Sequence, residues 1–327
     1  MKKVVLFDTS VGTMNQGDNI IMDSVLKQTK EIREGNYVIH FPTHTPCFTA
    51  YQQSKHNSRY SFVRNADLKL ICGTNIIAKR NLLPWPFWNV NLFNCGCYAG
   101  AVGMGVGSGG FGEETKIKGC TRALYKKILS KEYVHSTRDE KTKALLESIG
   151  LKAINTGCPT MWGLTPEHCS EIPTKKANSV VFTLTDGLNA PDADQGLIDL
   201  LVEKYDKVYY WPQGLTDIGY FGKMNNTDKI TVISPDIISY SNLMKSEPDL
   251  DYVGTRLHAG IFAMQHKKRA IILVVDNRAS DIAQTYHINV MDRTDMNALG
   301  SAIDSEFATE VKINLSNILE WKSQFLG

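Results

Sequence analysis

No stretch of this sequence stays apolar over the roughly 20 residues that a transmembrane helix needs. The apolar run behind Met1-Lys2-Lys3 spans residues 4–7 only, which is too short for the core of a signal peptide, and no small-residue cleavage site follows it. We therefore expect the chain to begin with a strand and to work in the cytoplasm.

Motifs for metal binding, phosphate loops and hydrolase nucleophiles are absent as well. The seven cysteines are irregularly spaced, and Cys95-Gly96-Cys97 has no second pair to complete a zinc site. The sequence has no Gly-x-Ser-x-Gly elbow, and its early glycine loop has no P-loop lysine. We predict reduced thiols, no metal and no cofactor.

Neither sign of charge dominates, because 36 Lys and Arg residues stand against 34 Asp and Glu, for a net charge of +2. A general nucleic-acid-binding protein carries a larger basic excess, so nucleic acid is not an expected partner. Contact with an anionic membrane surface is expected to be peripheral at most. Hydrophobic residues make up 43% of the chain, as in soluble globular proteins.

What the sequence does contain is a repeated alternation of short buried strands and helices. Strands are predicted at residues 4–7, 37–41, 68–72, 98–104 and 133–136, and again at 179–184, 207–211, 230–233, 251–253 and 270–275. A chain of 327 residues is too long for one ordinary core. The pattern predicts an α/β fold with two Rossmann-like, doubly wound parallel sheets and a cleft between them.

The two halves are separated by residues 165–178, a stretch with two prolines and no periodicity, which predicts a linker. The predicted N-terminal domain covers residues 1–170, and the C-terminal domain covers residues 178–305. Residues 306–327 carry apolar positions at helical spacing and predict a C-terminal helix.

The most informative segment is Gly254-Thr255-Arg256-Leu257-His258-Ala259-Gly260, which lies where a strand passes into a helix. Ligands of open α/β sheets bind at that edge. The guanidinium of Arg256 suits a carboxylate or phosphate, and His258 can move a proton near neutral pH. In an extended segment, a spacing of two puts both side chains on one face. We predict an anionic substrate and acid–base chemistry, with His258 as either acid or base.

Further anion-binding positions are predicted in the N-terminal half. Arg138 opens a helix, where a cation opposes the helix dipole and favours a bound anion, although a structural pair with Asp139 or Glu140 is the alternative. The loop at residues 12–19 precedes a helix, and its backbone N–H groups could cradle an anion. The candidate positions in this loop are Gly12, Asn15, Gly17 and Asp18.

Aromatic residues suggest where a sugar would bind, because tryptophan rings stack on sugar faces. Trp85 and Trp88 lie in a segment with two prolines, and Trp211 and Gln213 lie at the end of a strand that faces the predicted cleft. These four are candidate acceptor-binding residues, with ordinary packing of the two segments as the alternative.

Several of these segments follow one another in a characteristic order. The order runs from loop 12–19 through Gly73-Thr74-Asn75, the glycine-rich loop 105–112, Ser136-Thr137-Arg138-Asp139 and the Arg-Leu-His segment to Asp276-Asn277-Arg278. Over about residues 4–285 it resembles the polysaccharide pyruvyl transferase family. The resemblance implies a GT-B-like fold whose C-terminal helix crosses back to the first domain. It adds donor-binding candidates, namely Gly73, Thr74, Asn75, Leu257, Asp276, Asn277 and Arg278.

The resemblance also implies an activity. It implies transfer of the enolpyruvyl group of phosphoenolpyruvate to a hexose of a surface polysaccharide or its lipid-linked precursor, as a ketal with release of phosphate. Expected partners are phosphoenolpyruvate and the hexose-containing glycan, with a cytoplasmic location that allows contact with the inner membrane face; a homo-oligomer stays open. Two alternatives are a GT-B glycosyltransferase that uses a nucleotide sugar and a glycan-binding protein without activity.

Overall fold

The computed structural model describes residues 1–54, 58–79, 88–91, 94–275 and 286–326, and it shows two compact units. Unit 1 comprises Met1–Thr13, Ile21–Trp162 and Asn314–Gly327, and unit 2 comprises Met14–Ile20 and Gly163–Ile313. The division differs from the predicted domains, first because unit 2 ends at Ile313 and not at residue 305. Unit 2 begins at Gly163 instead of after the linker, and it takes in a short segment of the early loop.

Unit 1 contains a four-stranded parallel sheet in the order β2-β1-β3-β5. Its strands are β1 (Lys3–Asp8), β2 (Tyr37–Pro42), β3 (Leu68–Cys72) and β5 (Val102–Met104). Two short parallel pairs accompany it: β4 (Ile77–Ala78) with β6 (Ser108–Gly109), and β7 (His135–Thr137) with β8 (Ala153–Asn155). The central strands β1 and β3 are almost wholly buried, as expected for a parallel sheet covered on both faces.

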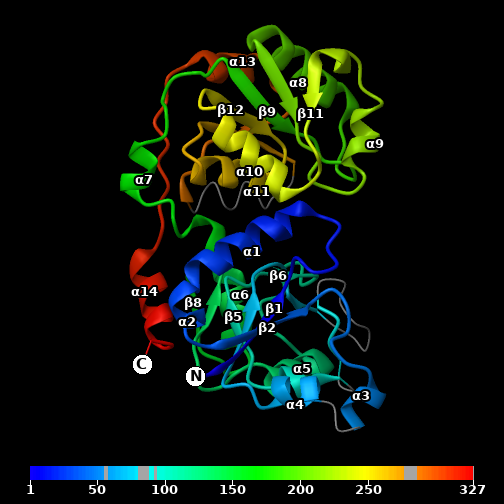
Figure 1. Ribbon diagram of the computed structural model, residues 1–327, viewed down its shortest axis with the longest axis vertical. Helices are drawn as coiled ribbons and strands as arrows, with labels where there is room; N and C mark the ends of the chain where they lie inside the picture. Colours follow the sequence, from blue (N-terminus) through cyan, green and yellow to red (C-terminus); the bar gives the residue numbers. More distant parts are fainter. Residues whose placement is uncertain (55–57, 80–87, 92–93, 276–285, 327) are drawn as a thin grey trace. The chain divides into compact units, whose positions relative to one another are not determined.

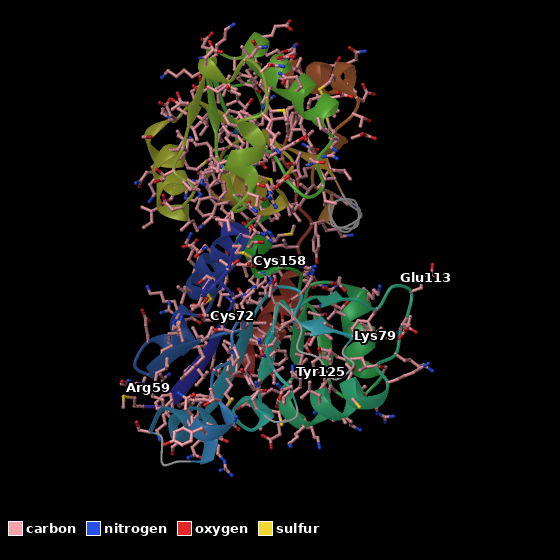
Figure 2. All side chains as sticks on the ribbon, turned by 90° about the vertical axis from the view of Figure 1, so that its right-hand side faces the viewer. Arg59, Cys72, Lys79, Glu113, Tyr125 and Cys158 are labelled. Atoms are coloured by element: carbon pink, nitrogen blue, oxygen red, sulfur yellow. The ribbon has the colours of Figure 1, made fainter. Side chains whose placement is uncertain are left out.

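The helices of unit 1 come from both ends of the chain. They are α1 (Gln16–Gln28, whose first turn belongs to unit 2), α2 (Lys30–Arg33), α3 (Ala50–Ser54), α4 (Ser58–Arg64), α5 (Gly119–Ile128), α6 (Glu140–Glu147) and α14 (Leu315–Ser323), with 3-10 turns at Cys95–Tyr98 and Pro159–Met161. Tyr125 of α5 lies inside the unit, where its hydroxyl accepts a hydrogen bond of 2.7 Å from the Ala78 N–H (Figure 2).

The C-terminal helix α14 packs on unit 1. Its Trp321 is buried, and the indole N–H donates a hydrogen bond of 2.9 Å to the Val134 carbonyl. Lys322 of the same helix donates to the Gln28 side chain at 2.6 Å. Contacts far apart in the sequence therefore place the end of the chain in the first unit.

Unit 2 contains a six-stranded parallel sheet in the order β11-β10-β9-β12-β13-β14. The strands are β9 (Ser179–Thr183), β10 (Lys207–Tyr210), β11 (Ile230–Val232), β12 (Leu250–Gly254), β13 (Ala270–Val274) and β14 (Val290–Asp292). The chain builds the sheet outward from β9 in one direction and then returns to add β12, β13 and β14 on the other side. This is the strand order of a Rossmann fold, so the prediction of parallel, doubly wound sheets is confirmed.

Helices cover both faces of the sheet in unit 2 (Figure 1). One apolar cluster joins the sheet to α8 (Pro191–Lys204), α9 (Asp217–Phe221) and α13 (Met296–Asp304). The opposite face is covered by α10 (Ile237–Ser246) and α11 (Leu257–Gln265), where Gly260 lies against Tyr252 and Ile272. The unit is completed by α7 (Pro166–Ser170) and a 3-10 turn at Thr227–Lys229.

The described residues also bear on thiols and membranes. All seven cysteines are free, and five of them are buried. Among the helices of the described ranges, none combines the length and the hydropathy that crossing a bilayer requires.

Candidate active site

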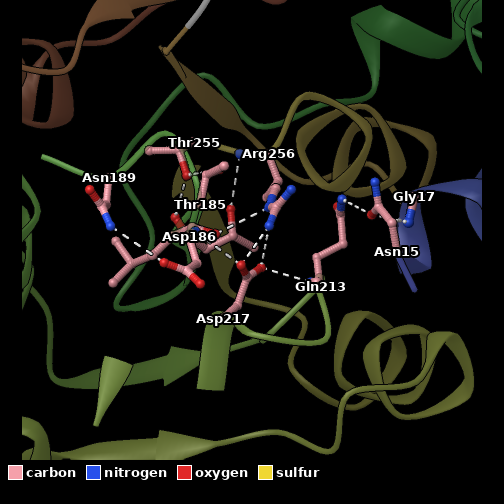
Figure 3. A network of polar contacts seen from close by, with 12 residues as sticks. Asn15, Gly17, Thr185, Asp186, Asn189, Gln213, Asp217, Thr255 and Arg256 are labelled. Atoms are coloured by element: carbon pink, nitrogen blue, oxygen red, sulfur yellow. Dashed lines mark hydrogen bonds and ion pairs between the residues drawn. The ribbon is translucent and has the colours of Figure 1, made fainter. Parts of the chain in front are cut away.

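The candidate site of unit 2 lies where the winding of its sheet changes direction. Strands β9 and β12 are hydrogen-bonded neighbours, but the chain leaves them toward opposite edges of the sheet. In open α/β sheets, ligands bind beyond the carboxyl ends of the strands at such a point. Thr185 follows β9 there, Gln213 follows β10 and Arg256 follows β12 (Figure 3).

Arg256 is held in place by several contacts. It caps α11, and its backbone N–H donates to the Thr183 hydroxyl at 3.1 Å. Its guanidinium donates through Nε to the Leu184 carbonyl at 3.2 Å and through Nη2 to both carboxylate oxygens of Asp217 at 2.6 Å. The side chain stays 17% exposed. The ion pair therefore fixes one side of the guanidinium and leaves part of it accessible.

Asp217, which sequence reasoning missed, is the fully buried partner in this pair. Its carboxylate also accepts backbone hydrogen bonds from Gly214 at 2.7 Å and from Asp186 at 3.1 Å. A side chain at Gly214 would place its Cβ 2.7 Å from Nη2 of Arg256, so this turn needs a glycine. An acidic residue shortly after a predicted strand was the available signal, but its partner lies 39 positions away.

His258 is half-buried in the first turn of α11, and Leu257 begins that helix. The assumption of an extended segment was therefore wrong, because His258 is helical and Arg256 is the residue before the helix. The ring lies beside Gly17, where an added Cβ would be 3.4 Å from Nδ1 of His258.

Asn15, Gly17 and Gln213 come together next to His258 (Figure 3). The Asn15 side-chain oxygen accepts hydrogen bonds from the Gly17 N–H at 3.0 Å and from Nε2 of Gln213 at 2.8 Å. Gln213 is 3% exposed, and its Oε1 has no hydrogen-bond partner among the described residues. The structure thus joins the early loop to the loop after β10.

The predicted backbone anion cradle at the start of α1 is wrong. The N–H groups of Gln16, Gly17 and Asp18 donate to the Gln213 carbonyl, the Asn15 side chain and the Asn15 carbonyl, at 2.8, 3.0 and 3.0 Å. These donors are used within the protein. Gly12 lies outside this turn, and its φ of +77° explains why a glycine stands there.

In unit 1, three loops at the carboxyl ends of strands surround Arg138. Its guanidinium donates to the Asn75 side chain at 2.5 Å, and its Nε lies 3.6 Å from the Asp139 carboxylate. Asp139 itself caps α6 by accepting from the Thr142 N–H at 2.7 Å. A Cβ at Gly107 would lie 2.3 Å from Nε of Arg138. Arg138 thus combines the predicted structural contact with 16% exposure of its side chain.

Gly73 and Thr74 shape the loop that carries Asn75. Both have left-handed backbone conformations, with φ of +75° and +55°. The Gly73 N–H donates to the Met104 carbonyl at 2.9 Å, and the Thr74 carbonyl accepts from the Gly107 N–H at 2.8 Å. Their contribution is to the geometry around Arg138.

The remaining predicted site residues do not join these clusters. Trp88 is wholly buried between Tyr98 and Tyr125, and Trp211 is wholly buried against Tyr240. Burial removes both indole faces from a sugar, so the acceptor-binding prediction is wrong for them. Trp85, Asp276, Asn277 and Arg278 lie outside the described residues. Within the described ranges, no group of three His, Cys, Asp or Glu side chains is arranged to hold a metal ion.

Comparison with known proteins identifies the family. The model of the polysaccharide pyruvyl transferase family matches residues 15–277, which is most of the chain. The chain therefore belongs to the polysaccharide pyruvyl transferase family and is an enzyme of the transferase class. A search of curated protein sequences found no match.

A search of solved structures matched the chain to proteins of low identity. One is the E. coli heptosyltransferase WaaC with ADP-2-deoxy-2-fluoro heptose, at 12% identity and a TM-score of 0.38, covering 83% of this chain and 88% of that one. Another is UDP-GlcNAc 2-epimerase from Neisseria meningitidis bound to UDP-GlcNAc, at 12% identity and a TM-score of 0.47, covering 100% of this chain and 93% of that one.

Proposed function

We propose that this protein transfers the pyruvyl group of phosphoenolpyruvate to two hydroxyls of a hexose in a surface glycan or its lipid-linked precursor, forming a ketal and releasing phosphate. Family membership supports the class of reaction. The observation that carries the choice of donor is Arg256, a partly exposed guanidinium at the switch point of the sheet, two positions from His258.

In this proposal Arg256 binds one anionic group of phosphoenolpyruvate. Its planar fork matches a carboxylate or phosphate, and Asp217 holds it in one orientation. The guanidinium also stabilises the charge that develops on the departing phosphate. Arg138 is proposed as an anion ligand within unit 1, since contacts with Asn75 and Asp139 hold its guanidinium and its side chain stays partly accessible.

His258 moves the protons. The imidazolium gives a proton to C3 of phosphoenolpyruvate, which becomes a methyl group and leaves C2 cationic. A sugar hydroxyl attacks C2, and the neutral imidazole takes the proton of that hydroxyl. Phosphate then leaves with the proton of a second hydroxyl, whose oxygen closes the ketal. The proton on His258 is thus restored at the end of each cycle.

The test is release of phosphate from phosphoenolpyruvate by the purified protein with galactose- and mannose-type acceptors. We expect acceptor-dependent release, reduced about 10²–10⁴-fold in His258→Gln because general acid–base catalysis is lost. His266→Gln is the matched control, since His266 caps the C-terminal end of the helix whose first turn holds His258, and it should keep full activity.

Two results would contradict the proposal. Absence of phosphate release with every acceptor, together with thermal stabilisation by a UDP- or GDP-sugar, would indicate a glycosyltransferase. Sugar binding without turnover of either donor would indicate a glycan-binding protein.

A further inference from the structure

A buried charge without a counter-charge lies in the sheet of unit 1. Lys69 is the one charged residue of β3 and is only 4% exposed. Its ammonium donates to the carbonyls of Ala99 at 2.7 Å and Arg64 at 3.2 Å, but no carboxylate among the described residues pairs with it. Buried charges are normally paired, because removing an ion from water is costly. Burial accordingly lowers the pKa of Lys69.

Lys268 in unit 2 is a buried lysine that has carboxylates nearby, and it serves as a comparison for Lys69. It is 6% exposed, and its ammonium also donates to two backbone carbonyls, those of Glu247 at 2.7 Å and Pro248 at 2.9 Å. Burial lowers the pKa of Lys268 too, but the nearby carboxylates of Asp249 and Glu247 oppose that effect. Lys69 has the same carbonyl contacts and lacks the carboxylates.

Lys69 lines a pocket of about 520 Å³ at the amino ends of the strands of unit 1. Arg138, which contacts Asn75 beyond the carboxyl end of β3, lies at the other end of that strand. Three further lysines line the pocket, namely Lys126, Lys127 and Lys131, together with the carboxylates of Asp67 and Glu132. Asp67 is already engaged, since its carboxylate accepts from the Lys3 N–H at 2.7 Å.

The lysines at the pocket belong to a strongly basic stretch of the chain. Residues 115–131, which include α5, hold six basic residues and no acidic one, although the whole chain has a net charge of only +2. Eight lysines elsewhere form ion pairs with Asp or Glu. The three exposed pocket lysines form none within the described residues. Their charge is therefore available to a ligand.

We propose that this pocket is a phosphate-binding site, in which Lys126, Lys127 and Lys131 bind a phosphate group and Lys69 supplies a buried positive charge behind it. The ligand chemistry is a phosphoester, which either a phospholipid headgroup or a soluble metabolite carries. The bound phosphate supplies the counter-charge that Lys69 lacks. The site is independent of Arg256, His258 and the reaction proposed for them.

The experiment has two arms, run on the full chain. One measures sedimentation with vesicles of phosphatidylglycerol, with phosphatidylcholine vesicles for comparison. The other measures binding of glycerol 1-phosphate by calorimetry at constant ionic strength. In at least one arm we expect saturable binding that falls about tenfold or more in Lys126→Ser/Lys127→Ser/Lys131→Ser, because the variant removes three of the charges that bind the phosphate.

Matched variants distinguish binding at the pocket from binding to any positively charged surface of the protein. Lys229→Ser/Lys245→Ser/Lys312→Ser removes the same charge from exposed positions of unit 2 and should bind like the wild type. Lys69→Met should weaken binding, whereas Lys268→Met should not. Binding in the vesicle arm alone identifies a lipid headgroup, and binding of glycerol 1-phosphate identifies a soluble phosphoester.

The proposal is overturned if the wild type binds neither ligand, or if the pocket variant binds as well as the unit 2 control. Because the three pocket lysines are exposed, their replacement should leave the thermal unfolding temperature unchanged. Loss of binding then reports on the site and not on folding.

Discussion

Replacing Arg256 by alanine tests whether its pair with Asp217 supports the site as well as the fold. The variant leaves a fully buried carboxylate without its cation. Breaking a buried pair from one side costs about 3–5 kcal/mol, and the partial exposure of Arg256 favours the lower end. At about 2–4 °C per kcal/mol for a domain of this size, we expect unfolding about 6–12 °C below the wild type.

A second substitution separates stability from activity. Asp217→Asn removes the buried charge but keeps an oxygen that can accept from the Gly214 or Asp186 N–H. In Arg256→Ala/Asp217→Asn we therefore expect about 1–3 kcal/mol of the lost stability to return, as coupled neighbours do not add. Phosphate release should stay absent in both variants, because neither has the guanidinium. Thermal unfolding and phosphate release on the same samples measure the two effects.

Arg269 provides the control. It forms a buried pair with Asp251 in the same unit, at 2.8 Å and with 1% of its side chain exposed. Asp251 is the second residue of β12, whereas Arg256 follows the strand, so the two pairs lie at opposite ends of it. Arg269→Ala should lose at least as much stability, yet its folded fraction should keep normal kcat/KM. Full activity in folded Arg256→Ala, or no gain of stability in the double variant, would refute the reasoning.

Three further predictions concern single residues. Gly17→Ala places a methyl group 3.4 Å from Nδ1 of His258 and 3.0 Å from a Gln213 nitrogen. The main effect should therefore be a lower kcat and not a lower unfolding temperature; unchanged kinetics would contradict this. Burial lowers the pKa of His135 to about 4, so the unfolded chain binds the proton first as pH falls from 6.5. Stability should therefore drop by about 3 kcal/mol between pH 6.5 and 4 in urea titrations, and His135→Gln should flatten that slope. Trp321→Ala should destabilise unit 1 by about 3–5 kcal/mol in denaturant unfolding, since the indole is 1% exposed; a smaller change would mean that α14 packs loosely.

The local pattern of the chain was enough to predict the parallel sheets and the Arg-Leu-His turn. Runs such as residues 4–7 and 270–274 are apolar on both faces, as buried parallel strands require. The glycines around Arg256 were also evident in the sequence, and the structure shows why two of these positions need a glycine. A Cβ at Gly254 would lie 2.6 Å from the Thr183 hydroxyl, and one at Gly260 would lie 2.6 Å from Ile272.

Other features depended on residues that are distant in the chain. Asp217 reaches Arg256 only because the parallel strands β10 and β12 end at a common edge of the sheet. Gln213 contacts Asn15 across 198 positions of the chain. Trp88 and Trp211 were predicted to bind a sugar, but the tertiary structure buries both side chains. The sequence likewise did not predict which carbonyls Lys69 contacts, or which acceptors the N–H groups at the start of α1 bind. Periodicity reports which side of an element is apolar, whereas pairing, burial and electrostatic balance are decided when the elements pack.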